Sequence, residues 1–336
     1  MLTVLKPQAL AHPGASILSP LRYPGSKRRF AGYVRRVLAL NGLRPELFVE
    51  PFAGGASVAL QLLNDGAVER IGLIDKDPLV AAFWRTVFFD TAWLVRQVET
   101  MEVSLERWSF WRKTQPKTVR RQALKCLFLN RTSFSGILAP CAGPIGGRAQ
   151  QSDYDISCRF PRETLVRRIE QAAALREKVA FVWGVTWPAG IARIARMQST
   201  GRLPADVFYY FDPPFFEKAD RLYTHYFTEP DHRKLRDHIL TEKAWWLLSY
   251  DSVDRVRELY GQVPTQVDLL YSVASNAGQK AVQEIVLSNV NRLPEQTRLW
   301  RKSAEWLATR SLSSIAAANG DDVGRNQPAL GRTAVG

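Results

Sequence analysis

The sequence predicts a mixed α/β fold in which a largely parallel sheet is interrupted by a mainly helical insert. Short apolar runs alternate with helical stretches over residues 47–85, helical patterns rich in Arg, Lys and Trp dominate residues 86–204, and strand-like runs return from residue 205. Alternating strands and helices are typical of a parallel sheet covered by helices. We therefore predict one domain formed by residues 19–85 and 205–300, with an insert at 86–204.

Local patterns predict the individual elements. Residues 1–18 and 305–336 show no apolar periodicity, so we expect two flexible tails. We expect strands at residues 47–49, 71–74, 205–211, 244–248 and 284–287, because these runs are rich in apolar, β-branched or aromatic side chains. A helix is expected at residues 56–63, after a glycine turn.

Charge and cysteine content narrow the classes of function. The chain has 46 Lys and Arg against 32 Asp and Glu, and its net charge of +14 favours a polyanionic partner such as nucleic acid. Cys126, Cys141 and Cys158 form no Cys-x-x-Cys pair, so neither a disulfide framework nor a metal site is predicted. The chain has no apolar run long enough for a membrane span, and we expect a cytoplasmic protein without membrane contact.

The first candidate site is a strand-to-helix turn with the sequence EPFAGGA at residues 50–56. Glycine lets the backbone approach a ligand closely, and the N-terminus of the following helix favours a polar or anionic group. The next expected strand ends at Asp75, where Rossmann-like units place the acid that accepts hydrogen bonds from ribose hydroxyls. The G-x-G-x-x-G fingerprint is missing, so an adenosine cofactor without a pyrophosphate fits better than a nicotinamide or flavin.

The second motif is Asp212-Pro213-Pro214-Phe215, directly after the expected strand at 205–211. Two prolines remove backbone donors and restrict φ, which makes the loop stiff and rich in acceptors. The Asp212 carboxylate and a backbone carbonyl match the two N–H donors of a nucleobase amine, and holding both directs the nitrogen lone pair at a methyl donor. Phe215 is expected to stack on a base rotated out of the duplex.

These motifs and their order resemble the adenine-specific DNA methyltransferases of the Dam type over roughly residues 20–292. The resemblance is carried by RYPGSK at 22–27, residues 48–55, Asp75, NRTSFSG at 130–136 and DPPF at 212–215. It implies a Rossmann-like S-adenosylmethionine-dependent methyltransferase sheet with a target-recognition insert. It also implies that Asp212 binds the target amine and that S-adenosylmethionine is contacted by Tyr23, Lys27, Phe52, Gly54, Asp75 and Asp212.

Two positions depart from the pattern of that family. Phe215 stands where tyrosine is usual, and Tyr23 stands where tryptophan is common. Both substitutions keep an aromatic ring, so stacking is expected to survive, whereas any hydrogen bond from a hydroxyl at position 215 is lost. Residues 223–240 and 284–289 are similar to the closing segments of the family, and no role is assigned to their members.

The insert is the expected DNA-binding part. Its basic residues interleave with aromatic ones between residues 107 and 131, a density that positions a phosphate backbone. We select Arg131 and Arg148 as DNA contacts; Arg148 lies in a Gly-rich stretch, 136–154, expected to form a loop or hairpin, and would read a guanine edge bidentately. The expected partner is double-stranded DNA, bound by a monomer, and a partner restriction endonuclease is left open.

The resulting prediction is direct methyl transfer to adenine N6 at specific DNA sites, with base flipping. Methylation of the exocyclic amine of cytosine, an RNA substrate, or a catalytically inactive DNA-binding relative are the alternatives; the cytosine signature usually begins with serine, so Asp212 favours adenine. A cytosine-5 methyltransferase needs a cysteine nucleophile. Pro140-Cys141 supplies the dipeptide without a preceding strand, so this class is disfavoured.

Overall fold

The strands of the protein form a single sheet. The computed structural model describes residues 16–22, 27, 30–216, 225–261, 265–272, 279–295 and 297, and within them the sheet has the order β3-β2-β1-β4-β5-β7-β6. The strands are β1 (Leu47–Glu50), β2 (Arg70–Ile74), β3 (Val179–Trp183), β4 (Val207–Phe211), β5 (Trp245–Asp251), β6 (Thr265–Ser272) and β7 (Gln279–Ser288). Neighbours from β3 to β5 pair in parallel, and β7 pairs antiparallel with β5 and β6. The predicted α/β class with a mostly parallel sheet is confirmed.

Five strands were predicted from the sequence, and each is present as β1, β2, β4, β5 or β7. The edge strand β3 was not predicted, although it pairs in parallel with β2. Helix α8 (Trp187–Ser199) packs Ile191 and Ile194 into the apolar cluster on one face of the sheet. The prediction that residues 86–204 all belong to an insert is therefore wrong from residue 179 onward. A five-residue apolar run carries too little periodicity to separate a strand from a buried helical turn.

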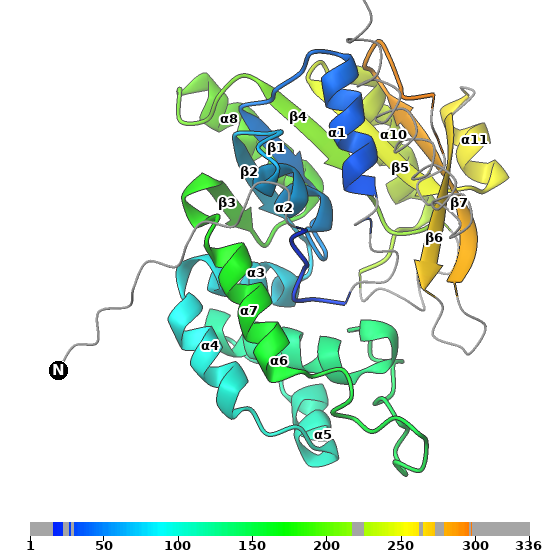
Figure 1. Cartoon of the computed structure of the whole chain (residues 1–336). Helices are drawn as coiled ribbons and strands as arrows, with labels where there is room; N and C mark the ends of the chain where they lie inside the picture. Colours follow the sequence, from blue (N-terminus) through cyan, green and yellow to red (C-terminus); the bar gives the residue numbers. More distant parts are fainter. Residues whose placement is uncertain are drawn as a thin grey trace, which may run out of the picture.

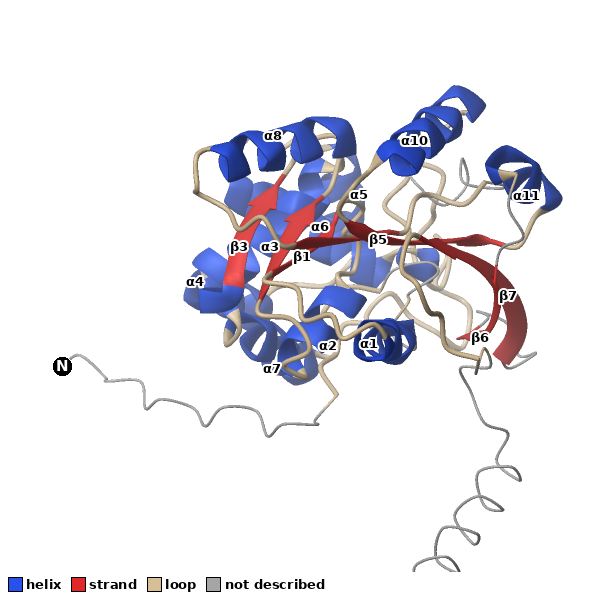
Figure 2. Ribbon diagram, turned by 90° about the horizontal axis from the view of Figure 1, so that it is seen from above, coloured by secondary structure: helices blue, strands red, loops and turns tan. Residues whose placement is uncertain are grey.

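Helices cover both faces of the sheet. Figure 2 shows α8, α10 (Glu229–Thr241) and α11 (Asp254–Tyr260) on one face, and α1 (Phe30–Leu40) and α2 (Ser57–Asn64) on the other. The residues of α1 that point inward, among them Phe30 and Val34, are fully buried. Burying such a side chain stabilises the fold by roughly 1.5–3 kcal/mol. Parallel strands buried on both faces explain why β1 and β4 are apolar along their length.

A group of helices gathers below the sheet in Figure 1. They are α3 (Pro78–Phe89), α4 (Thr91–Thr100), α5 (Leu105–Lys113), α6 (Val119–Thr132) and α7 (Arg162–Ala173). Ser104 and Thr118 accept hydrogen bonds from the first turns of α5 and α6 and so mark where these helices begin. Between α6 and α7 the chain forms a 3-10 turn, η1 (Phe134–Gly136), and a run of further turns.

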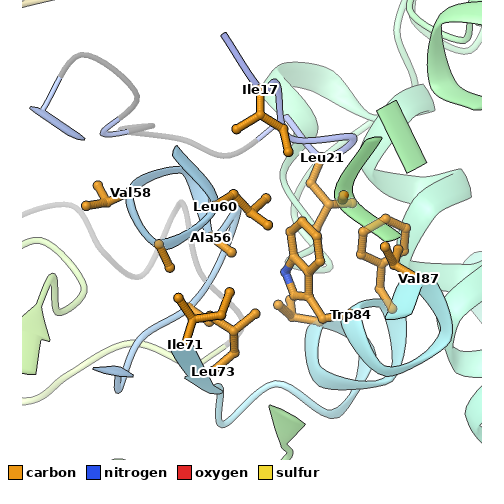
Figure 3. Packing of buried hydrophobic residues seen from close by; sticks show 14 of the residues in the cluster. Ile17, Leu21, Ala56, Val58, Leu60, Ile71, Leu73, Trp84 and Val87 are labelled. Atoms are coloured by element: carbon orange, nitrogen blue, oxygen red, sulfur yellow. The ribbon is translucent and has the colours of Figure 1, made fainter. Parts of the chain in front are cut away.

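The helical group and the sheet share one core around Trp84 of α3. Figure 3 shows its indole beside Leu21 and Val87, facing Leu60 of α2 and Leu73 of β2. The indole nitrogen donates a hydrogen bond of 2.8 Å to the carbonyl of Gly54. A buried indole N–H needs an acceptor, so this packing also holds the glycine turn in place.

Several sequence predictions fall on other parts of the chain. Most of the tail expected at residues 1–18, the whole tail expected at 305–336, and Tyr23 lie outside the described residues. Among the helices that are described, none combines the length and apolarity required to cross a bilayer.

Candidate active site

The sheet has a topological switch point between β1 and β4. The chain proceeds from β1 to β2 and β3 in one direction, and from β4 to β5 in the other, while β1 and β4 themselves pair in parallel. In such sheets the loops after the two strands diverge and leave a crevice at their carboxyl ends. The loops concerned begin at Pro51 and at Asp212, which are the two motifs singled out in the sequence.

A cavity of about 230 Å³ lies at this crevice. Four loops line it, at residues 50–58, 75–77, 136–138 and 186–188, and residues 225–227 contribute a further wall. The predicted site residues Lys27, Phe52, Gly54, Asp75 and Asp212 all line this cavity. The fold thus brings together residues that are up to 185 positions apart in the printed sequence (Lys27 to Asp212).

The glycine turn is held in an unusual backbone conformation. Gly54 has φ +45°, and Ala56, the residue before α2, has φ +48° and ψ +30°. The left-handed region is open to glycine but strained for alanine, and such strain is concentrated at functional sites. Ala56 provides no side-chain cap for α2, and the carboxylate of Glu50 accepts from the Ala59 amide in the first turn. The start of the helix, at Ser57 and Val58, borders the cavity.

Asp75 binds backbone amides of the loops that follow β1 and β2. One carboxylate oxygen accepts a hydrogen bond of 2.8 Å from the Gly54 amide, and the other accepts one of 2.8 Å from the Asp77 amide. Burial, and next the charge of Asp77, raise the pKa of Asp75 to about 7, although both backbone hydrogen bonds act in the opposite direction. Each oxygen keeps a second lone pair for a hydroxyl donor.

Asp212 directly follows β4 and is held by two donors on the same oxygen. Its Oδ1 atom lies 3.0 Å from the Lys27 ammonium and accepts a 2.9 Å hydrogen bond from the Ser249 hydroxyl. Ser249 also lies 2.9 Å from the hydroxyl of Tyr210. A hydroxyl has one proton, so Tyr210 donates to Ser249, which donates to Asp212. Oδ2 accepts no hydrogen bond from any residue within the described ranges.

Lys27 joins two acidic residues from β7 and from the end of β4, the strands on either side of β5. Its ammonium lies 3.0 Å from Asp212 and 2.9 Å from Oε1 of Glu284 on β7, and its side chain is 5% exposed. It also lies 5.6 Å from the centre of the Phe215 ring, within cation–π range. One buried cation therefore positions both the acid and the aromatic residue of the DPPF loop.

Glu50 is a site residue that sequence reasoning missed. It ends β1 beside the glycine turn, is buried, and accepts a 2.7 Å hydrogen bond from the Ala59 amide in α2. Burial raises the pKa of Glu50 to about 8; the Ala59 amide opposes this shift, and the nearby charge of Asp212 adds to it. The EPFAGGA sequence predicts a loop, but the burial of its first residue, Glu50, depends on the neighbouring strand β4.

The raised pKa of Glu50 predicts how stability depends on pH. Folded protein holds a proton on Glu50 between pH about 4.5 and 8, where the unfolded chain has released it, so the contribution of Glu50 to the unfolding free energy falls as pH rises. We expect Glu50→Gln to gain stability over the wild type on going from pH 5.5 to 9, on the order of a few kcal/mol. Chemical unfolding of unliganded protein at both pH values measures it. The matched variant Glu99→Gln, at an exposed position, should show no such gain, and an equal gain in both variants contradicts the prediction.

An aromatic cluster packs against the residue that follows the DPPF motif, Phe216. The Phe216 amide donates a 2.9 Å hydrogen bond to Asp251 at the end of β5, and its ring stacks on His232 with centroids 4.3 Å apart. Nδ1 of His232 lies 2.6 Å from the Tyr250 hydroxyl. Burial lowers the pKa of His232 to about 4, so the imidazole remains neutral near pH 7. Phe227, which lines the cavity, packs edge-on against Phe52, and their ring centroids are 5.5 Å apart.

The two predicted DNA contacts have different surroundings. Arg148 is exposed in a loop of turns, whereas Arg131 is 5% exposed and donates a 2.6 Å hydrogen bond to the carbonyl of Arg159. Arg131 is therefore less accessible than Arg148, and its contact with DNA stays a prediction. Other arginines of the helical group also bind groups of the protein itself. Arg120 pairs with Asp90, and Arg112 donates hydrogen bonds to the carbonyls of Leu138 and Ala142.

The remaining sequence-predicted residues also have defined places. Pro214 lines the cavity, Pro213 is buried beside it, and Phe215 lies over Lys27. Ser249 and Glu284 were missed as partners of the catalytic motif. Their positions follow from strand register, because β5 places Ser249 beside the end of β4, and β7 places Glu284 opposite Asp251.

Comparison with known proteins is consistent with this site. The family model of the D12 class N6 adenine-specific DNA methyltransferases matches residues 23–140, a range that contains Lys27, the glycine turn and Asp75. A search among curated proteins gives no match to the chain. A DNA methyltransferase in general uses S-adenosylmethionine as its methyl donor, and its substrate is DNA. Through residues 23–140 the chain is therefore similar to the D12 class N6 adenine-specific DNA methyltransferases.

Proposed function

We propose that this enzyme methylates N6 of adenine at specific sites in double-stranded DNA by direct transfer from S-adenosylmethionine. The observation that carries the proposal is the position of Asp212, whose carboxylate shares one cavity with the glycine turn and Asp75. The amine acceptor and the groups expected to bind the methyl donor are thus within one site. Incubating the protein with duplex DNA and S-adenosylmethionine, followed by nucleoside analysis of the DNA, tests it; N6-methyladenine is expected, and methylation of cytosine alone overturns it.

The charge of the cavity fits a cationic methyl donor. Five carboxylates line it, those of Glu50, Asp75, Asp77, Asp212 and Asp231, against three lysines, in a chain whose net charge is +14. Burial raises the pKa of Glu50 to about 8 and that of Asp75 to about 7, and a bound cation would favour the charged forms of these two acids. When bound, S-adenosylmethionine supplies a methyl group on a positively charged sulfur atom.

Three groups are proposed to hold this cofactor. The Gly54 turn brings backbone close to it, the start of α2 at the cavity wall favours its carboxylate, and Asp75 accepts from its ribose hydroxyls. The rings of Phe52 and Phe227 offer apolar surface to its adenine. Lys27, which the resemblance also assigns to the cofactor, contacts Asp212, Glu284 and Phe215, and its proposed role is to hold the DPPF loop.

The proposed role of Asp212 is to orient the target amine. Lys27 and Ser249 hold the carboxylate through Oδ1, and Oδ2 is proposed to accept one N–H of the amine. A carbonyl of the DPPF loop accepts the other N–H, because the two prolines leave the loop rich in acceptors. With both hydrogens held, the nitrogen lone pair is directed away from the ring plane, and the reaction is favoured by orientation and electrostatic stabilisation.

The target adenine is proposed to leave the DNA stack before transfer. The N6 amine of a paired base lies within the duplex, and enzymes that act on a base rotate it into a pocket. Phe215 is proposed to stack on the rotated base. Phenylalanine has no hydroxyl, so this contact contributes stacking without a hydrogen bond.

Asp75→Asn is expected to weaken S-adenosylmethionine binding about tenfold to a hundredfold, because a charge-assisted hydrogen bond to the ribose becomes a neutral one. The pKa of Asp75 is raised to about 7, so wild-type affinity should rise between pH 6 and 8 as the carboxylate forms, while that of the variant stays flat. Isothermal titration calorimetry measures both. The control is Asp153→Asn, at an exposed position; a variant at position 75 with unchanged affinity and pH profile rules out the role.

The helical group between residues 86 and 178 is proposed to contain the target-recognition part, with Arg148 as a reader of guanine. Support comes from its exposed position on a loop of turns, which leaves the guanidinium accessible to a groove. Action as a monomer is part of the same proposal, and a restriction endonuclease is a further proposed partner.

A further inference from the structure

Four arginines from separate segments converge beside the active-site cavity: Arg22, Arg131, Arg159 and Arg168. Arg131 donates to the backbone carbonyl of Arg159 at 2.6 Å. The backbone of Arg22 is held on both sides by Asn130, the neighbour of Arg131, through hydrogen bonds of 2.7 and 2.5 Å. Arg168 of α7 donates to the carbonyl of Ser19, three residues before Arg22, at 3.4 Å. We call these four residues the arginine cluster.

Three members of the arginine cluster have no acidic partner among the described residues. Within the described residues, no ion pair includes Arg22, Arg131 or Arg159. Burial, followed by the charges of the other three arginines, lowers the pKa of Arg131 to about 9. Nη1 of Arg22 is buried and donates to no acceptor in the described part of the chain. Like charges gathered with buried donors are unfavourable unless an anion joins them.

The arginine cluster adjoins the wall of the cavity and remains accessible. Gly136, which lines the cavity, has φ +77°, and a side chain there would meet the Arg22 carbonyl at 2.5 Å. In Figure 1 residues 16–22, in dark blue, run toward α6 and α7, where Asn130 and Arg168 bind them. Arg159 is exposed, and Arg22 and Arg168 are partly exposed, above the buried Arg131. An anion can therefore reach the guanidinium groups from solvent.

We propose that the arginine cluster binds a phosphate group of the DNA backbone next to the target adenine, a role that rests on the proposed function. The planar guanidinium fork matches two phosphate oxygens, and several forks around one phosphate give a fixed position. Free phosphate offers the same chemistry. The DNA backbone is favoured because the arginine cluster borders the substrate cavity, where a bound phosphate sets the register of the duplex and carries no sequence information.

The test is the salt dependence of DNA binding by the full chain. Arg22→Ala and Arg159→Ala are compared with Arg167→Ala, an exposed arginine adjacent to Arg168 in sequence; the backbone bonds of Arg22 to Asn130 do not depend on its side chain. Fluorescence anisotropy with a labelled duplex over a range of NaCl concentrations yields the slope of log Kd against log salt. Removing one phosphate contact should reduce this slope by about one and weaken binding about tenfold near physiological salt.

Three further readouts separate the outcomes. Support requires a reduced slope for Arg22→Ala and Arg159→Ala, an unchanged slope for Arg167→Ala, and unchanged S-adenosylmethionine affinity in all three. Stabilisation of the wild type by inorganic phosphate that is lost in the variants, with DNA slopes unaltered, assigns the site to free phosphate and overturns the DNA proposal. Slopes equal to wild type, with no phosphate effect, overturn the site itself. Methyl transfer to DNA by the wild type is assayed separately, so failure of the proposed function is distinguished from failure of the site.

Discussion

Asp212→Ala is expected to lower kcat for methylation of adenine about a thousandfold or more, while S-adenosylmethionine binds with nearly unchanged affinity. The carboxylate is the only proposed acidic acceptor for the target amine, so its loss leaves the amine lone pair conjugated into the ring and poorly oriented. The glycine turn and Asp75, which are proposed to hold the cofactor, keep their own hydrogen bonds to one another. Transfer of radiolabelled methyl groups to duplex DNA measures kcat, and calorimetry measures cofactor binding.

A second variant separates charge from geometry. Asp212→Asn retains an oxygen that can accept from Ser249 but removes the negative charge paired with Lys27. It is expected to lose most of the activity as well, because an amide offers one acceptor and places a donor against the target amine. Full activity of Asp212→Ala contradicts the assignment of the motif. Loss of cofactor binding in both variants instead assigns Asp212 to the cofactor rather than to the base.

Lys27→Met is expected to lower the free energy of unfolding by about 3 kcal/mol or more, because removing one partner of a buried ion pair leaves unbalanced charge. Glu284 is fully buried, and the Lys27 ammonium lies 2.9 Å from it and 3.0 Å from Asp212. Chemical unfolding of the unliganded variant and of the wild type measures the loss.

The double variant Lys27→Met/Glu284→Gln provides the control. Replacing the second buried charge with an amide removes much of the imbalance, so stability should recover by more than the sum of the single effects predicts. Methyl transfer should not recover with it, because Asp212 still lacks the cation that fixes its Oδ1 atom. Recovery of both stability and activity makes Lys27 a purely structural residue. Absence of any destabilisation in Lys27→Met contradicts the buried ion pair.

The sequence by itself determined the central strands and the two motifs at their ends. Apolar runs such as 207–211, followed at once by Asp-Pro-Pro, contain both the strand and the turn that ends it, and β4 forms as predicted. The glycine turn was also predictable from local sequence. Glycine adopts the positive φ that the turn needs at Gly54, and the residues directly after the turn form an amphipathic helix. The match of residues 23–140 to an adenine methyltransferase family agrees with what these local patterns imply.

Only the tertiary structure decided which partners these residues have. Ser249 and Glu284 reach Asp212 and Lys27 through the register of β5 and β7, and β3 joins the sheet by pairing with β2 although helices surround it in the sequence. The same holds for Arg131, which the sequence predicts as a DNA contact and which the fold buries beside the other members of the arginine cluster. Burial and pairing between residues distant in the chain depend on packing, and no local pattern encodes them.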